Sequence, residues 1–194
     1  MTSLNEHYLI VPGWNGSGQD HWQSHWQTQL PNSSRTQVDS WSHPELNDWV
    51  SSLNRAVSQA KGPVVLIAHS LGCVTIAHWA QRHPKLLSKI KGALLVAPAD
   101  VERWSVNQRL SGFGPIPMQP LPFPSLVVGS TNDHTASLER IQHFANEWRS
   151  AIHIIHGAGH INTASGHTHW NDGLHLLRCF NFLGTLSSEQ RRIA

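Results

Sequence analysis

The sequence predicts a three-layer α/β/α fold, in which a mostly parallel sheet of about six strands lies between two layers of helices. Short apolar runs rich in β-branched residues alternate along the chain with segments whose apolar residues recur at helical spacing. This alternation is typical of parallel sheets, because parallel strands are joined by crossover helices. The 194 residues suffice for a sizeable core, and we expect a single domain over 1–194.

The first elements follow in order from the amino-terminal end. HYLIVPG at 7–13 predicts a strand that ends in a turn, DHWQSHWQTQL at 20–30 a helix, and RTQVDSW at 35–41 a second strand. Ser42 is followed three residues later by Glu45, a capping-box pattern that predicts the start of another helix. Six apolar residues of that helix fall on one face: Leu46, Trp49, Val50, Leu53, Val57 and Ala60.

The middle of the chain holds the most apolar strands. VVLIAH predicts a buried strand over 63–69, and the helix 71–82 follows it directly. Further strands are predicted at 90–99 and at 124–133. The segment 104–124 before the second of these is rich in proline and cannot form a regular helix, so we expect an irregular excursion over the surface.

The last elements are a helix near 137–149, a strand at 151–160 and a helix at 170–184, with a tail over 187–194. Most tryptophans lie on predicted helix faces and are expected in the core: Trp22, Trp26, Trp49, Trp79 and Trp148. Both cysteines, Cys73 and Cys179, lie in apolar helix-like settings and are expected as reduced core thiols.

The composition excludes several functions. Charged residues make up 13% and the formal net charge is +2, so no strongly charged partner is expected, and Arg191 with Arg192 do not make a nucleic-acid patch. No run approaches the ~18 apolar residues of a membrane span, and the first residues lack the features of a secretory signal. We therefore expect a cytoplasmic protein that binds neither nucleic acid nor membrane. Its oligomeric state is unknown at this level.

The stretch AHSLG at 68–72 points to nucleophilic chemistry at Ser70. It is close to the G-x-S-x-G nucleophile elbow, with Ala68 where glycine usually stands and Gly72 in its usual place. Small flanking residues suit the sharp strand-to-helix turn that such a serine needs. The unpaired N–H of Leu71, at the start of the helix, is a candidate oxyanion donor. Taken alone, the pentapeptide is equally compatible with a structural serine turn.

A serine nucleophile needs a base and an orienting acid, which follow in the chain order Ser, acid, His in this architecture. Asp133 ends one predicted strand and His160 ends the next, where both side chains would reach the same edge of the sheet. A turn residue is the alternative for Asp133, and Asp100 is the alternative acid. The chain has 15 histidines, so His160 gains meaning from its position rather than from its type.

Three further expectations concern the surroundings of this site. The glycine-rich turn VPGWNGSG at 11–18 would bring the N–H of Trp14 to the oxyanion, and it does not match a phosphate-binding loop. His69 is expected to pack beside the nucleophile, and no metal or other cofactor site is expected, because no H-E-x-x-H occurs. Aromatic and apolar residues of the loops are candidates for an acyl pocket: Trp41, Trp104, Phe113, Met118 and Phe123.

With these motifs the chain resembles the α/β-hydrolase fold, and within it the small serine hydrolases of the retinoblastoma-binding-protein-nine/YdeN family. The similarity runs from Tyr8 to about Leu183. Two positions depart from the family pattern, Ala68 in the elbow and His134 in place of proline. The resemblance implies a minimal fold that begins at the third strand of larger hydrolases and lacks a large lid. The resemblance is carried by the PG turn at Pro12, His21 with Trp22, the elbow at Ser70, ND at Asp133 and GH at His160.

The function expected from these residues is hydrolysis of a carboxylic ester, thioester or small amide through an acyl-enzyme on Ser70. The partner is then a small-molecule acyl substrate, whose chain length and leaving group the sequence does not specify. The alternative is a binding module that keeps the hydrolase fold and site without useful turnover. An intact Ser-Asp-His set argues against the alternative, because binding alone does not need all three residues.

Overall fold

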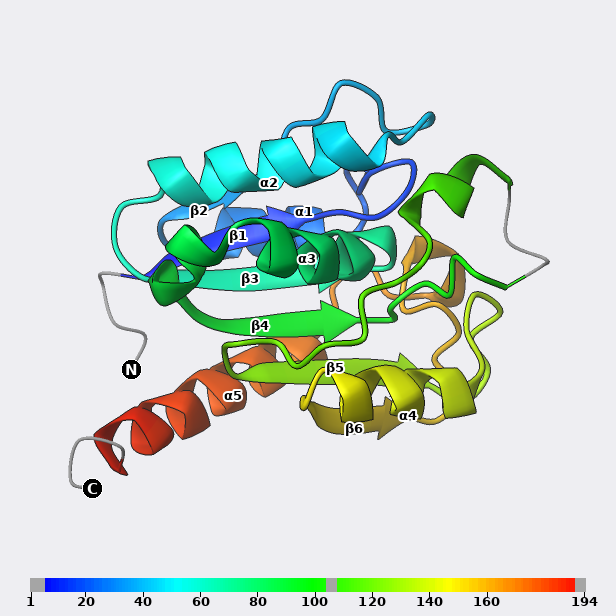
Figure 1. Cartoon of the computed structure of the whole chain (residues 1–194). Helices are drawn as coiled ribbons and strands as arrows, with labels where there is room; N and C mark the ends of the chain where they lie inside the picture. The colour runs from blue at the N-terminus through cyan, green and yellow to red at the C-terminus, as the bar shows by residue number, and fades with distance from the viewer. Residues whose placement is uncertain (1–5, 104–107, 191–194) are drawn as a thin grey trace.

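The computed structural model describes residues 6–103 and 108–190, and its centre is one six-stranded sheet (Figure 1). The strand order is β2-β1-β3-β4-β5-β6, and every neighbouring pair is parallel. The strands are β1 (His7–Val11), β2 (Ser33–Arg35), β3 (Val64–His69), β4 (Ile90–Val96), β5 (Ser125–Ser130) and β6 (Ala151–Ile155).

Helices cover both faces of the sheet, as the sequence predicts. In Figure 1, α2, α3 and α4 lie over one face and α1 and α5 over the other. The α-helices are α1 (Trp22–Gln29), α2 (Leu46–Gln59), α3 (Leu71–Arg82), α4 (Leu138–Glu147) and α5 (Asn171–Gln190). Three short 3-10 helices are η1 (Pro84–Lys89), η2 (Gln108–Phe113) and η3 (Thr163–Ser165).

The sheet divides the apolar side chains into two cores, one on each face. In β3, Leu66 packs with the residues of α2, α3 and α4, and its neighbour Ile67 packs with those of α1 and α5. Successive strand residues point to opposite faces, and all six residues of β3 are buried. This explains the unbroken apolar run of β3. The five tryptophans expected in the core are all buried there.

The second strand and the start of α2 differ from the positions predicted from the sequence. The strand predicted at 35–41 is Ser33–Arg35, because only these three residues pair with β1 before the chain turns away. The predicted capping box is absent. Glu45 is the residue that caps α2, without a side-chain bond, and the Ser42 hydroxyl contacts the neighbouring His43. Local sequence could not reveal this, since the strand depends on pairing with a distant partner.

Other differences concern where elements end. The last three strands stop several residues before their predicted ends. After β4 and β6 the chain enters left-handed conformations at Ala97 (φ 48°) and Gly157 (φ 68°). Helix α5 continues to Gln190, so the tail predicted from 187 is helical to that residue. Within the irregular segment 104–124, the described residues form η2 and turns. Cys179 is exposed, so the expectation of a core thiol is wrong for it, whereas Cys73 is buried, and both are free.

The order of the strands creates one place where a ligand can reach the sheet. β1 lies between β2 and β3, so the chain turns in opposite directions after β1 and after β3. Loops that leave the carboxyl ends of such strands diverge and leave a crevice. Gly72 lets α3 approach this point closely, because a Cβ on Gly72 would lie 2.3 Å from the carbonyl oxygen of Val11.

Substitution of Gly72 by alanine should therefore destabilise the fold. The added methyl would overlap backbone atoms of Val11 and Pro12, which cannot move without shifting β1. We expect a loss of about 1–3 kcal/mol in the free energy of unfolding, measured by urea titration. Gly112→Ala is the matched control, because nothing lies within 4 Å of its added Cβ. Equal urea midpoints for Gly72→Ala and Gly112→Ala would contradict the close approach of α3 to the end of β1.

Candidate active site

Ser70 lies in a strained turn between β3 and α3. Its φ of 53° and ψ of −119° are unfavourable for a residue with a side chain, and strain of this kind often marks functional sites. The Ser70 N–H donates to the carbonyl of Val96 at 2.9 Å, which ties the turn to β4. On the other side, a Cβ on Gly13 would lie 2.8 Å from Ser70 Cβ. Ala68, which replaces the usual glycine, is fully buried in the core, where its methyl packs.

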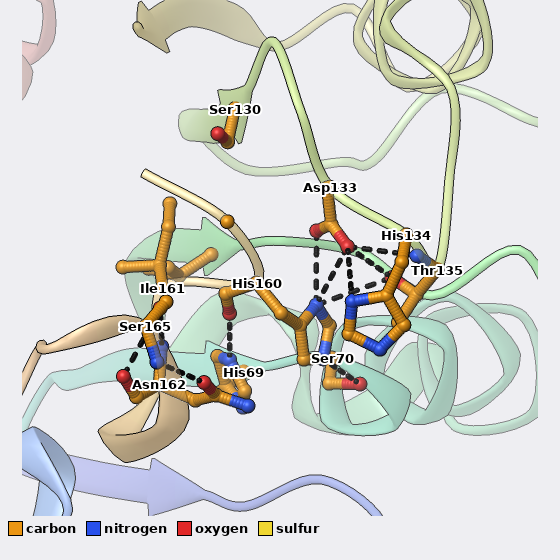
Figure 2. A network of polar contacts seen from close by, with 12 residues as sticks. His69, Ser70, Ser130, Asp133, His134, Thr135, His160, Ile161, Asn162 and Ser165 are labelled. Carbon is orange, nitrogen blue, oxygen red and sulfur yellow. Dashed lines mark hydrogen bonds and ion pairs between the residues drawn. The ribbon is translucent and has the colours of Figure 1, made fainter. Parts of the chain in front are cut away.

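Ser70, His160 and Asp133 form a continuous chain of hydrogen bonds (Figure 2). His160 Nε2 is 3.0 Å from Ser70 Oγ, and His160 Nδ1 is 2.9 Å from Asp133 Oδ2. A carboxylate only accepts hydrogen bonds, so Nδ1 carries the proton and Nε2 can accept the serine proton. All three residues are nearly buried, at 8% exposure each. The fold therefore brings together three side chains that lie far apart in the sequence.

The loops that carry the acid and the base are bonded to each other. The Asn132 side-chain oxygen accepts hydrogen bonds from the N–H of Gly159 (2.7 Å) and from the Ser130 hydroxyl (2.8 Å). The Thr131 hydroxyl oxygen accepts one from the N–H of Gly157 (3.1 Å). These contacts set the distance between Asp133 and His160. Sequence reasoning missed Asn132, because the pair Asn-Asp alone signals only a turn.

Two further histidines pack in a row behind the base. His69 Nε2 donates to the carbonyl of His160 at 2.9 Å, and its ring lies 4.8 Å from that of His160 and 4.9 Å from that of His21. Burial, with the nearby His160 and His21, holds the pKa of His69 well below its usual value. Burial, with Arg35 and His160 nearby, lowers the pKa of His21 to about 4. His69 thus packs beside the nucleophile as expected and is neutral at pH 7.

The first part of the loop after β1 is held beside the nucleophile by hydrogen bonds to the segment before α2. The N–H of Asn15 donates to the carbonyl of Trp41 at 2.9 Å, and the Trp14 indole donates to the carbonyl of Ser42 at 3.1 Å. The Cβ position of Gly13 is 3.4 Å from the backbone nitrogen of Leu71. Trp14, the next residue, and Leu71 therefore lie on adjacent segments next to Ser70.

Gln23 anchors the other end of this loop and was not singled out from the sequence. Its side chain is completely buried, and its amide donates to the carbonyls of Ile67 (3.0 Å) and Val11 (3.4 Å). Its side-chain oxygen accepts a hydrogen bond from the Ser17 hydroxyl at 2.6 Å. Gln23 thus connects the loop to both β1 and β3. In the sequence, Gln23 is marked only by its position between Trp22 and Trp26, the two buried tryptophans of α1.

The four described residues among those expected to line an acyl pocket belong to one apolar cluster. Phe113 has no exposed surface and packs edge-on against Trp49, and Phe123 is 6% exposed, so both belong to the core. Trp41 and Met118 are partly buried against the same core. Trp104 lies outside the described residues.

A cavity of about 640 Å³ lies at the opposite, amino edge of the sheet and takes no part in this site. It is lined by the starts of β1 and β2 and by the segment between α2 and β3, including His7 and Lys61. Among residues 6–103 and 108–190, no three histidine, cysteine or acidic side chains are grouped to hold a metal ion. No helix in that same part of the chain is long and apolar enough to cross a membrane.

A strained serine after a central strand, hydrogen-bonded to a histidine–aspartate pair, defines the class of nucleophilic serine enzymes built on a parallel α/β sheet. The chain belongs to the serine hydrolase family, whose model matches residues 8–179. The described residues contain no large lid, in agreement with the resemblance seen in the sequence.

Solved structures agree with this membership. A YdeN-like hydrolase from Pectobacterium atrosepticum is 34% identical, with 93% of this chain and 92% of that chain covered and a TM-score of 0.81. The ydeN gene product of B. subtilis shares the fold at 19% identity, with 91% and 98% covered and a TM-score of 0.73. Thermogutta terrifontis esterase 2 shares it at 16% identity, with 90% and 83% covered and a TM-score of 0.66. No functionally curated protein matches the sequence significantly.

The buried histidines should make the protein sensitive to acid. Because the pKa of His21 is about 4 in the fold and 6.5 in the unfolded chain, the unfolded chain binds more protons between these values. The free energy of unfolding should therefore fall as the pH drops from about 6.5 towards 4, by at most roughly 1.4 kcal/mol per pH unit for each such histidine.

His21→Asn tests this in urea titrations at pH 7, 6 and 5. Asparagine can still accept the hydrogen bond from the N–H of Gln23 but does not titrate, so the dependence on pH should be shallower. His143→Asn, at an exposed position of α4, should keep the slope of the unchanged protein. If His21→Asn were as sensitive to acid as His143→Asn, the buried neutral state of His21 would be contradicted.

Proposed function

We propose that this serine hydrolase cleaves carboxylic esters, thioesters or small amides through an acyl-enzyme on Ser70. One observation carries the proposal: the strained Ser70 hydroxyl lies 3.0 Å from His160 Nε2, whose other ring nitrogen is 2.9 Å from the Asp133 carboxylate. This arrangement matches the requirements of a serine nucleophile with its base and orienting acid.

The first half of the reaction forms the acyl-enzyme. His160 Nε2 accepts the proton of the Ser70 hydroxyl while Oγ attacks the substrate carbonyl carbon. The negative charge on the carbonyl oxygen is met by the N–H groups of Leu71 and Trp14, and each such donor typically contributes about 10²- to 10³-fold to the rate. His160 then gives its proton to the departing alcohol, thiol or amine, and the acyl group stays on Ser70.

The second half repeats these steps with water. His160 takes a proton from water, whose oxygen attacks the acyl carbon, and Ser70 leaves with the proton that His160 returns. Asp133 accepts a hydrogen bond from His160 Nδ1 throughout, which keeps the ring in the tautomer that both halves need. No cofactor takes part in this sequence of steps.

The alternative function, a binding module without useful turnover, would not need this strain. A backbone at φ 53° costs of order 1–3 kcal/mol, and a structural serine could relax from it. The contacts from Gly13 and Val96 that hold Ser70 in place are what a nucleophile requires and what a binding surface does not. A cytoplasmic location is part of the proposal as well, and the two free thiols support it.

Labelling with a fluorophosphonate tests the nucleophile. We expect one adduct on Ser70, located by intact mass and peptide mapping, and none on Ser70→Ala. The variant should stay folded, because only a hydroxyl is removed, and thermal unfolding checks this. A folded wild-type protein without an adduct would favour the binding module.

The acid is tested by Asp133→Asn. The amide would offer a donor towards His160 Nδ1 or favour the wrong tautomer, so hydrolysis of p-nitrophenyl acetate should fall by about 10³- to 10⁴-fold. Asp100→Asn is the matched control, since Asp100 pairs with Arg140 at 3.3 Å and not with His160. A greater loss in Asp100→Asn than in Asp133→Asn would reverse the assignment of the acid.

A further inference from the structure

We propose that Thr135 is a positioning residue of the catalytic acid, and that its hydroxyl holds the Asp133 carboxylate in the orientation in which it serves His160. Thr135 Oγ1 is 2.9 Å from Asp133 Oδ1 and 3.1 Å from His160 Nδ1 (Figure 2). No other side-chain hydroxyl among the described residues is bonded to both members of this pair. The inference rests on the proposed function, because it assigns a task at the same site.

The chemistry of the three groups fixes the direction of the hydrogen bonds. A carboxylate has no proton, so the Thr135 hydroxyl donates to Asp133 Oδ1. The Thr135 backbone N–H donates to the same oxygen at 2.8 Å. Thr135 therefore supplies two donors to Oδ1, which also lies 3.1 Å from His160 Nδ1, while Oδ2 is closer to that nitrogen at 2.9 Å. A lone pair of the hydroxyl oxygen remains directed at the same imidazole N–H.

Thr135 is itself held by the segment that follows β4. The N–H of Asp100 donates to the carbonyl of Thr135 at 3.3 Å, and the Arg103 guanidinium donates to the carbonyl of His134 at 3.0 Å. The next residue, Ala136, is completely buried. These contacts fix the backbone that carries the Thr135 hydroxyl. By contrast, the side chain of His134, which lies between Asp133 and Thr135 in the sequence, is 79% exposed.

The hydroxyl affects both the geometry and the basicity of the acid. Without it, Oδ1 loses one of its two donors from Thr135, and the carboxylate can rotate about the remaining bonds, so His160 spends less time in the reactive orientation. The carboxylate also keeps more negative charge, which favours the protonated imidazole. Four groups face or influence His160: Asp133, His134 with its ring at 5.5 Å, His69 at 4.8 Å, and His21 behind His69. Burial keeps His69 and His21 neutral, so neither adds a charge beside His160 near neutral pH. We therefore expect the lost hydrogen bond to Asp133 to be the main electrostatic change at His160.

The test compares Thr135→Val with Thr135→Ser. Valine has the same shape but no hydroxyl, whereas serine keeps the hydroxyl and loses a methyl. For p-nitrophenyl acetate we expect Thr135→Val to lower kcat about tenfold with KM nearly unchanged, and to move the acid limb of kcat/KM to higher pH. Thr135→Ser should recover most of this loss. Equal losses in the two variants would show that packing, and not the hydroxyl, is what Thr135 supplies.

A double variant tests whether Thr135 acts through Asp133. In the Asp133→Asn background the carboxylate is gone, so adding Thr135→Val should cost less than twofold. A full tenfold loss in that background would overturn the assignment. Thermal unfolding of every variant separates these effects from loss of fold.

A readout without turnover distinguishes failure of this inference from failure of the proposed function. In the Ser70→Ala background, the His160 imidazole is titrated by NMR. Its midpoint should move to higher pH in Thr135→Val and stay in place in Thr135→Ser. Coincident titrations would overturn the inference, whatever the activity. Absence of a fluorophosphonate adduct on wild-type Ser70, together with a shifted titration, would instead remove the proposed function and leave the contact between Thr135 and Asp133 established.

Discussion

Ser70 keeps φ at 53° because the surrounding backbone leaves it no other conformation, and the rest of the site depends on that constraint. Val96 accepts its N–H, while the turn is flanked so closely by Gly13 and Gly72 that neither could carry a side chain. The turn directs the hydroxyl out of the sheet towards His160, and it places the N–H groups at the start of α3 beside it. Relaxing the serine would move both the nucleophile and the N–H groups proposed here as oxyanion donors.

The remaining groups reach Ser70 because parallel strands end at one edge of the sheet. Asp133 follows β5 and His160 follows β6, and Asn132 joins their loops through the N–H of Gly159. On the other side, Gln23 joins the loop after β1 to β3. The Gln23 links are buried, where an unmade hydrogen bond is costly, and together with the Asn132 link they preorganise the site before a substrate arrives.

Electrostatics near the base follow from burial. The positive charge that His160 gains during turnover is balanced by Asp133, and the two histidines packed behind it add none, because burial lowers the pKa of both His69 and His21. His69 contributes a hydrogen bond to the carbonyl of His160 instead. Because these two buried histidines are held neutral, the free energy of unfolding falls in acid.

Periodicity and the elbow motif by themselves determined the class of fold, the burial of β3 and the positions of Ser70, Asp133 and His160 at the ends of strands. These follow from local pattern, because an apolar run needs two covered faces and a strand-to-helix turn needs small neighbours. Tertiary structure alone decided the register of β2, the start of α2, the burial of Phe113 and the roles of Asn132, Gln23 and Thr135. Each of these depends on a partner distant in sequence or on the conformation of a loop, and such contacts leave no period in the chain.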